Sequence, residues 1–247
     1  MFPILQLGPL AIQVPGLVLL TGVWVGLSLA EREAARLRLK PDAVYSLAFT
    51  GLIAGVIGAR LVYVARYFSA YAADPLGIIL PNPATLAAAE GFLIGIIAAA
   101  IYGARRKLPL RPTLDALAPA IALMMAAIAL AHIASGDAFG SPARLPWSVY
   151  LWDDYRHPSQ IYEWIGALIV LGVWRQLRGW PSFPGFAFLL VVALSATARI
   201  FLEAFRGDSL LTVGGIRSAQ LWGMASLAAS LAAMKIWAAR GDAVSNE

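Results

Sequence analysis

The most polar stretch of this chain is Arg156-His157-Pro158-Ser159-Gln160-Ile161-Tyr162-Glu163, and an apolar segment begins directly behind it. The residue before a proline is pushed toward an extended conformation, so His157 is expected to be extended. Proline suits the first position of a helix, so the sequence predicts a helix that starts at Pro158. The N-terminus of that helix and the Arg156 side chain would form an anion site. The alternative is a capped turn at a membrane interface.

Apolar residues dominate the rest of the chain and indicate a membrane protein. The 247 residues are 60% hydrophobic and 13% charged, with a mean hydropathy of +0.73. A soluble domain carries about 25% charged residues. With no cysteine and two histidines, a thiol or zinc site is not expected, and no cofactor or metal is predicted. The net charge of +5 is attributed to basic cytoplasmic loops, so nucleic acid is not an expected partner.

Seven segments are apolar and long enough to span a bilayer, which needs roughly 20 residues. The fifth segment is the shortest. Because no repeat or linker divides the sequence, we expect one all-α polytopic membrane domain over residues 1–247. The predicted spans are residues 9–30, 43–65, 84–104, 114–134, 158–174, 184–205 and 216–237.

Basic residues predict the orientation of these spans. Lys and Arg gather between spans one and two, three and four, and five and six, and again at the end of span seven. By the positive-inside rule these ends are cytoplasmic, which places the N-terminus outside and the C-terminus inside. Loops 66–83 and 135–157 then lie outside, and the second is expected to form a small extracytoplasmic cap. Topology does not explain the arginines on the outer side, which are Arg60, Arg66, Arg144, Arg156, Arg199, Arg206 and Arg217.

Two groups of charged residues in the predicted helices are candidates for binding. Arg199, Glu203 and Arg206 have i, i+4, i+7 spacing and so share a helical face. They form either a structural ladder or a site in which Glu203 orients Arg199 toward a phosphate. Arg60 and Tyr63 share a face of the second span. Arg60 either reaches the lipid head groups or binds an anionic ligand.

Two further side chains are candidates for proton transfer. Glu90 lies near the start of the third span, where it either pairs with an arginine such as Arg60 or acts as a general base. His132 ends the fourth span. It is either a hydrogen-bonded core residue or a functional group beside Ser135 and Asp137.

Together these stretches resemble the prolipoprotein diacylglyceryl transferase family over essentially the whole chain. The polar stretch from Arg156 to Glu163 is similar to the family's RHPSQLYE almost letter for letter. The other matching segments are Gly58-Ala59-Arg60-Leu61-Val62-Tyr63-Val64, Ala73-Asp74-Pro75-Leu76, Ala198-Arg199-Ile200-Phe201-Leu202-Glu203-Ala204-Phe205-Arg206 and Ser218-Ala219-Gln220.

The resemblance implies an enzyme that moves a diacylglyceryl group from phosphatidylglycerol to the lipobox cysteine of a preprolipoprotein. It also implies a multi-pass protein of the bacterial inner membrane, with membrane lipids and the preprolipoprotein signal peptide as partners. A thiolate that attacks the glyceryl carbon needs a base, and the leaving phosphate needs cations such as Arg199, Arg60 and Arg156. The other residues implied to bind substrate are Tyr63, Asp137, Gly140, His157, Gln160, Glu163, Glu203 and Arg206.

The chain departs from the family pattern at the reacting centre. The histidine of the family's HGGLIG segment aligns with Glu90, so we expect Glu90 or His132 to replace it as the base and Arg199 to complete the catalytic set. The alternatives are a catalytically silent relative that binds lipid or a partner, and a transferase with another head group or acceptor.

The other departures lie in the family's RxGNxxNGExxG signature and at two tyrosines. The signature aligns with residues 129–140, where Gly136 and Gly140 remain and Asp137 stands for its glutamate. The family's arginine, two asparagines and two tyrosines are replaced by Ala129, His132, Ser135, Ser195 and Pro15.

Overall fold

The computed structural model describes residues 3–8, 10–73, 75–78, 85–180, 182–212 and 214–245. They form two compact units, each treated separately below. The large unit comprises Met1–Ala30 and Leu114–Glu247, and the small unit comprises Glu31–Thr113. Asp74 of the DPL motif and residues 79–83 of the predicted outer loop lie outside the described residues. That the whole chain is one membrane domain stays a prediction.

Long helices confirm the all-α prediction, and each of the seven predicted spans overlaps one of them. Six of these helices are long and apolar enough to cross a membrane. The exception is α6, because polar residues at both of its ends lower its hydropathy. By length and hydropathy, the predicted count of seven spans is therefore reduced to six. The helices are α1 (Val14–Arg36), α2 (Pro41–Arg66), α4 (Ala88–Arg105), α5 (Leu110–Ser135), α6 (Ser159–Leu177), α7 (Phe186–Leu202) and α8 (Ser218–Ser245).

Two short hairpins accompany the helices, and the sequence patterns predicted neither. Strand β1 (Ile4–Leu7) pairs antiparallel with β2 (Leu10–Gln13) directly before α1. Strand β3 (Val149–Leu151) pairs with β4 (Asp154–Arg156). The two residues in the turn of this second hairpin both have positive φ, as tight hairpins require. The second hairpin gives structure to the expected cap, residues 135–157, whose side of the membrane stays a prediction.

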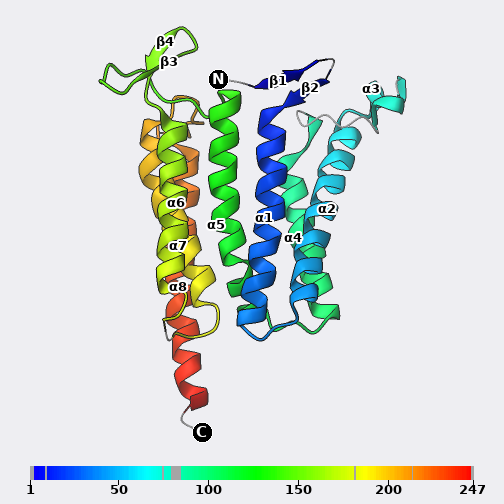
Figure 1. The fold of residues 1–247 in the computed structure, drawn as a ribbon, viewed down its shortest axis with the longest axis vertical. Helices are drawn as coiled ribbons and strands as arrows, with labels where there is room; N and C mark the ends of the chain where they lie inside the picture. Colours follow the sequence, from blue (N-terminus) through cyan, green and yellow to red (C-terminus); the bar gives the residue numbers. More distant parts are fainter. Residues whose placement is uncertain are drawn as a thin grey trace. The chain divides into compact units, whose positions relative to one another are not determined.

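In the large unit, α5, α6, α7 and α8 run side by side, and the β3–β4 hairpin lies at one end of them (Figure 1). Buried apolar side chains pack α5, α6 and α7 together. These side chains come from the first half of α5, the first half of α7 and the second half of α6. All three of these parts lie at the end of the helices away from the hairpin. This core consists of Ala118, Ala122, Val170, Trp174 and Val191.

Asp115 fixes α7 against α5 at the end away from the hairpin. Its carboxylate accepts hydrogen bonds from the backbone N–H groups of Gly185, at 2.6 Å, and Phe188, at 3.0 Å, and so caps the start of α7. Both helices therefore start at this level, and they run in the same direction because His132 and Arg199, near their other ends, line one pocket. At 1.5 Å per residue, His132 on α5 and Arg199 on α7 lie about 20–25 Å further along. This register brings the two residues to the same end.

In the small unit, glycines let α2 and α4 approach closely. A Cβ atom on Gly91 would lie 2.7 Å from the carbonyl oxygen of Gly55, and one on Gly95 would lie 2.7 Å from that of Gly51. Small residues four positions apart on both helices allow such backbone contact, which is a common way to pack helices in a membrane.

Candidate functional site

A pocket of about 180 Å³ lies between α5, α6 and α7 in the large unit. Its walls are mostly apolar. The polar side chains that line it are His132 from α5, Glu163 from α6, and Ser195 and Arg199 from α7. The fold therefore brings together two of the three predicted catalytic residues, His132 and Arg199, which lie far apart in sequence.

Glu163 is the centre of the charged network around this pocket. Its Oε1 accepts hydrogen bonds from Arg199 Nη1 at 3.2 Å and from Arg206 Nη1 at 2.8 Å. Its Oε2 lies 3.8 Å from His132 Nδ1, which is too far for a hydrogen bond. That nitrogen is buried and has no hydrogen-bond partner among the described residues. Glu163 thus contacts Arg199 and Arg206 and lies near His132.

Arg199 is the cation most open to the pocket, with 40% of its side chain exposed. Its Nη2 lies 2.9 Å from Oε2 of Glu203, a carboxylate that is only 2% exposed. The i, i+4 pair expected from the sequence is therefore present. A guanidinium offers donors along two edges, so Arg199 can hold Glu203 and still bind a phosphate.

Arg206 does not continue the helical ladder that its spacing predicted. Helix α7 ends at Leu202 and a short 3-10 turn, η3 (Glu203–Phe205), follows it, so Arg206 leaves the helical face. Its Nε and Nη2 donate hydrogen bonds to the two carboxylate oxygens of Asp208, at 2.9 and 2.7 Å. Burial alone would lower the pKa of Arg206. Its contacts with Asp208 and Glu163 stabilise the charged form more strongly, so the pKa is raised above its ordinary value. Arg206 is therefore a charged group that positions Glu163.

Arg217 fixes the segment that follows α7. Its Nη1 donates hydrogen bonds to the carbonyl oxygens of Glu203, at 2.6 Å, and Arg206, at 2.5 Å, and to Ser209 Oγ, at 2.8 Å. The sequence marked Arg217 as an unexplained outer arginine but assigned it no role. Asp208 carried no sequence signal, because its importance comes only from its contact with Arg206.

The polar start of α6 binds the loop that follows α5. Helix α6 begins at Ser159 with Pro158 as its N-cap, one residue later than predicted. Ser159 Oγ donates a hydrogen bond to the carbonyl oxygen of Ala138 at 2.6 Å, and Gln160 Nε2 donates one to that of Asp137 at 3.0 Å. Both α6 side chains are buried, whereas the Asp137 carboxylate is exposed. Gln160 and Asp137, both expected to bind substrate, meet each other here.

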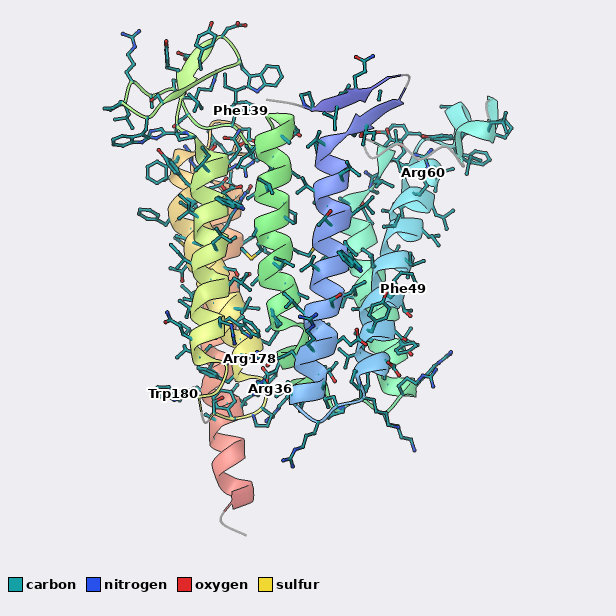
Figure 2. All side chains as sticks on the ribbon, in the orientation of Figure 1. Arg36, Phe49, Arg60, Phe139, Arg178 and Trp180 are labelled. Atoms are coloured by element: carbon teal, nitrogen blue, oxygen red, sulfur yellow. The ribbon has the colours of Figure 1, made fainter. Side chains whose placement is uncertain are left out.

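Arg156 contacts backbone carbonyl groups and an aromatic ring of the cap. Its Nε donates a hydrogen bond to the carbonyl oxygen of Leu151 at 2.9 Å, and its Nη1 donates one to that of Gly140 at 3.3 Å. Its guanidinium lies 5.0 Å from the ring centre of Phe139, at the hairpin end of the helices (Figure 2). These contacts favour the alternative, a structured turn that Arg156 stabilises.

Gly140 lies where three segments meet. The backbone N–H of Gly207 donates a hydrogen bond to the Phe139 carbonyl oxygen, and the N–H of Ser141 donates one to that of Phe205, both at 2.8 Å. A Cβ atom on Gly140 would overlap the carbonyl oxygen of His157. The cap, the segment after α7 and the start of α6 therefore depend on a glycine at this position.

His157 belongs to an aromatic group beside an apolar groove. Its ring centre lies 6.1 Å from that of Tyr162 and 5.2 Å from that of Phe205. These three residues line a groove of about 740 Å³ between α6 and α7. Trp147 of the cap also lines it, and its Nε1 donates a 2.8 Å hydrogen bond to the Tyr162 hydroxyl.

The apolar groove and the polar pocket are neighbours. Ala198 and Leu202 of α7 line both of them. A molecule with a polar head and long apolar tails could therefore occupy both without leaving the large unit.

In the small unit, Arg60 binds the connection between α2 and α4. Its Nε donates a hydrogen bond to the Ile78 carbonyl oxygen at 3.1 Å, and its Nη1 donates one to that of Thr85 at 3.0 Å. Its Nη2 donates to the Gly77 carbonyl oxygen, and the guanidinium lies 5.2 Å from the ring centre of Tyr71. Figure 2 shows Arg60 near the end of α2. The side chain holds its own loop rather than reaching out to head groups.

Glu90 pairs with Arg66, and this corrects the suggested pairing with Arg60. The two atoms, Arg66 Nη2 and Glu90 Oε1, lie 2.5 Å apart. Tyr63 packs against Tyr67, with ring centres 4.7 Å apart, so it is part of an aromatic contact near the end of α2. Glu90, the third predicted catalytic residue, belongs to the small unit, whereas the pocket belongs to the large one.

The pocket offers an exposed guanidinium, an imidazole and a carboxylate in an apolar surround. These groups suit anion binding and proton transfer. Within the described ranges, no group of histidine, aspartate and glutamate side chains gathers closely enough to hold a metal ion.

Comparison with known proteins gives a consistent match over the chain. A family model described as prolipoprotein diacylglyceryl transferase matches residues 3–236. A phosphatidylglycerol–prolipoprotein diacylglyceryl transferase of Nostoc sp. is 30% identical, covering 94% of this chain and 87% of that protein. Proteins of the same name from Synechococcus elongatus and Clostridioides difficile are 30% and 29% identical, covering 91% and 83% of this chain, and 83% of their own length in both cases.

Proposed function

Because the chain belongs to the prolipoprotein diacylglyceryl transferase family, we propose that it transfers the diacylglyceryl group of phosphatidylglycerol to the thiol of a lipobox cysteine. The family match covers both units, so the proposal concerns the whole chain. The substrates printed in the relatives' names, phosphatidylglycerol and a prolipoprotein, are carried over here as part of this proposal.

The observation that carries the proposal is the apolar groove beside the polar pocket. A phospholipid has acyl chains that suit a groove lined by α6 and α7, and a phosphodiester that suits Arg199. The shared wall at Ala198 and Leu202 allows the glyceryl carbons to lie between the two. A ligand that is apolar at one end and anionic at the other would fill both the groove and the pocket.

The reaction needs a base and assigns roles to Arg199 and Glu203. A base takes the proton of the cysteine thiol, and the thiolate attacks the glyceryl carbon next to the phosphate. The carbon–oxygen bond breaks and glycerol phosphate leaves with the electron pair. Arg199 stabilises the phosphate charge, and Glu203 orients Arg199. Arg60 and Arg156 are assigned structural roles, because backbone carbonyl groups already accept their hydrogen bonds.

The remaining predicted substrate-binding residues shape the surroundings of this site in the proposal. His157 borders the groove that holds the acyl chains. Gly140, Asp137 and Gln160 set the position of the cap over the start of α6. Tyr63 supports the loop next to Arg60 in the small unit.

Two residues, Glu90 and His132, are candidates for the base. Replacing each with its uncharged near-isostere, Glu90→Gln and His132→Asn, decides between them. The variant that removes the base should lower transfer by about 100-fold or more at neutral pH. Activity is measured as phosphatidylglycerol-dependent labelling of a lipobox peptide, and unchanged labelling would eliminate that residue.

The proposal also includes location and acceptor. The chain is placed in the bacterial inner membrane with its N-terminus outside and its C-terminus in the cytoplasm, as the distribution of Lys and Arg predicts. The preprolipoprotein signal peptide, an apolar segment followed by the lipobox cysteine, would meet the pocket from within the bilayer.

Complementation of a bacterial strain depleted of its own diacylglyceryl transferase tests the function in cells. The wild-type chain should restore growth and lipoprotein modification, and Arg199→Ala should not. Arg144→Ala is the matched control, because Arg144 is exposed and lies outside the pocket. Membrane levels of each variant are measured in parallel. Failure of the wild-type chain at normal levels would count against the proposal.

A further inference from the structure

Glu163 holds the position on Arg199 that a phosphate would take. We infer that a bound phosphodiester displaces the Glu163 carboxylate from Arg199, and that the carboxylate then turns to His132 Nδ1 and makes His132 the base of the reaction. The inference rests on the proposed function, since it deepens the role of the same pocket. It assigns Glu163 as a positioning residue rather than as a substrate contact.

The two contacts of Glu163 Oε1 are unequal. The bond from Arg199 is 3.2 Å long, and the bond from Arg206 is 2.8 Å long. Arg206 is further fixed by two bonds to Asp208, so it cannot follow a moving ligand. Arg199 is more exposed than Arg206, at 40% against 13%. An arriving phosphate therefore competes with Glu163 for Arg199 and leaves the bond from Arg206 intact.

His132 is placed to receive the released carboxylate. Glu163 Oε2 lies 3.8 Å from Nδ1, so a movement of roughly 1 Å produces a hydrogen bond. Nδ1 is buried and no described residue makes a hydrogen bond with it, although the side chain as a whole is 30% exposed. The exposed part of the imidazole ring therefore lies away from Nδ1. A carboxylate on Nδ1–H fixes the tautomer in which Nε2 has the free lone pair and can accept a proton.

The charged groups around His132 support this change. On α6 it faces Glu163, and α7 contributes Arg199 and Ser195 to the same pocket; no other charged side chain in the described part of the chain lines that pocket. The surrounding network balances its charges. The guanidinium groups of Arg199, Arg206 and Arg217 equal in number the carboxylates of Glu163, Glu203 and Asp208, although Arg217 contacts the backbone carbonyl of Glu203 rather than a carboxylate.

A phosphodiester adds one negative charge to this balanced network. His132 accepts the proton of the cysteine thiol, and its positive charge stabilises the second negative charge that develops on the phosphate as the thiolate attacks. The sulfur–carbon bond forms, the carbon–oxygen bond of the phosphodiester breaks, and its electron pair leaves on glycerol phosphate. His132 then returns its proton to that phosphate or to water. Binding of the correct donor thus prepares the base that the reaction needs.

Nitrogen NMR of the imidazole tests this inference directly. The chain has two histidines, so ¹⁵N-histidine labelling yields the Nδ1 and Nε2 signals of two imidazole rings, and His157→Asn identifies the pair from His132. Addition of phosphatidylglycerol to the detergent-solubilised protein should convert Nδ1 of His132 to a protonated, hydrogen-bonded nitrogen. Addition of phosphatidylglycerol to the Glu163→Gln variant should leave Nδ1 of His132 unchanged. Phosphorus NMR of the lipid shows whether it is bound.

A second variant tests the exchange without lipid. Arg199→Leu removes the competing partner, so His132 should show the protonated Nδ1 before any lipid is added. A His132 signal that stays the same in Arg199→Leu, and also in wild type with lipid bound, overturns the inference and leaves the transferase proposal standing. Absence of lipid binding to wild type overturns both.

Kinetics separate positioning from a merely structural role. Glu163→Asp keeps the carboxylate and should recover at least tenfold more transfer than Glu163→Gln at neutral pH. Raising the pH, which ionises the thiol without a base, should recover activity in Glu163→Gln. Equal activity of the two variants at every pH would contradict the assignment.

Discussion

Arg206 donates a 2.8 Å hydrogen bond from Nη1 to Glu163 Oε1 and so joins the segment after α7 to the first turns of α6. The two residues are 43 positions apart in sequence. Asp208 holds the other edge of the same guanidinium. Arg206 therefore sets where the Glu163 carboxylate can lie in the pocket.

Replacing Arg206 with lysine should destabilise this part of the protein. Lysine keeps the charge but cannot bind Asp208 with two donors and Glu163 with a third at once. We expect the free energy of unfolding in detergent to fall by about 1–3 kcal/mol. Arg144→Lys, on the exposed part of the cap, is the control and should leave stability unchanged. Equal stability of Arg206→Lys and wild type would show that the network is not needed for folding.

Replacing Arg199 with lysine should affect activity more than stability. The ammonium group can still pair with Glu203 but cannot offer a planar fork to the phosphate. We expect kcat/KM for phosphatidylglycerol to fall by about 100-fold, the usual loss for one transition-state donor, with the unfolding midpoint within a few degrees of wild type. Activity of Arg199→Lys close to wild type would remove Arg199 from the proposed phosphate site.

Replacing Gly140 with alanine should disturb the docking of the cap. The added methyl group would overlap the His157 carbonyl oxygen, and backbone atoms cannot move aside easily. Overpacking of this kind typically costs about 1–3 kcal/mol, so both stability and activity should fall. Gly172→Ala in α6 is the matched control, because a Cβ atom there would meet no atom of the described part of the chain within 4 Å. Similar thermal unfolding of both variants would contradict the tight contact.

Replacing Gly95 with alanine should loosen the crossing of α2 and α4. The new Cβ atom would lie 2.7 Å from the carbonyl oxygen of Gly51, so the helices must separate. We expect a loss of about 1–3 kcal/mol, measured by thermal unfolding in detergent. Gly16→Ala in α1, where a Cβ atom has open space, should be unaffected.

Sequence reasoning located the helices well, because their positions depend on local composition. Apolar segments and proline placed the start of α6 within one residue of Ser159. The same approach failed for the end of α7. That end depends on contacts of Arg206 with Glu163 and Asp208 and on the pairing of Gly140 with residues after α7, which no local pattern reveals.

The candidate site could be predicted only in part. Charged residues in apolar helices pointed to Arg199, Glu203 and His132, because such residues need partners. Which partner each one has depends on how the helices pack. The sequence suggested Arg60 for Glu90 where the structure has Arg66, and it suggested an anion site for Arg156 where the structure has backbone carbonyl groups. The contact of Glu163 with two arginines had no sequence signal at all.

The central claim is that this chain transfers diacylglyceryl from phosphatidylglycerol to a cysteine thiol. Its most direct test is mass spectrometry of a lipobox peptide incubated with the purified wild-type protein and phosphatidylglycerol. We predict a peptide whose mass has increased by one diacylglyceryl group on the cysteine, with release of glycerol phosphate and no product from a peptide with serine in place of that cysteine. An unmodified peptide in the presence of folded protein with bound lipid would contradict the account.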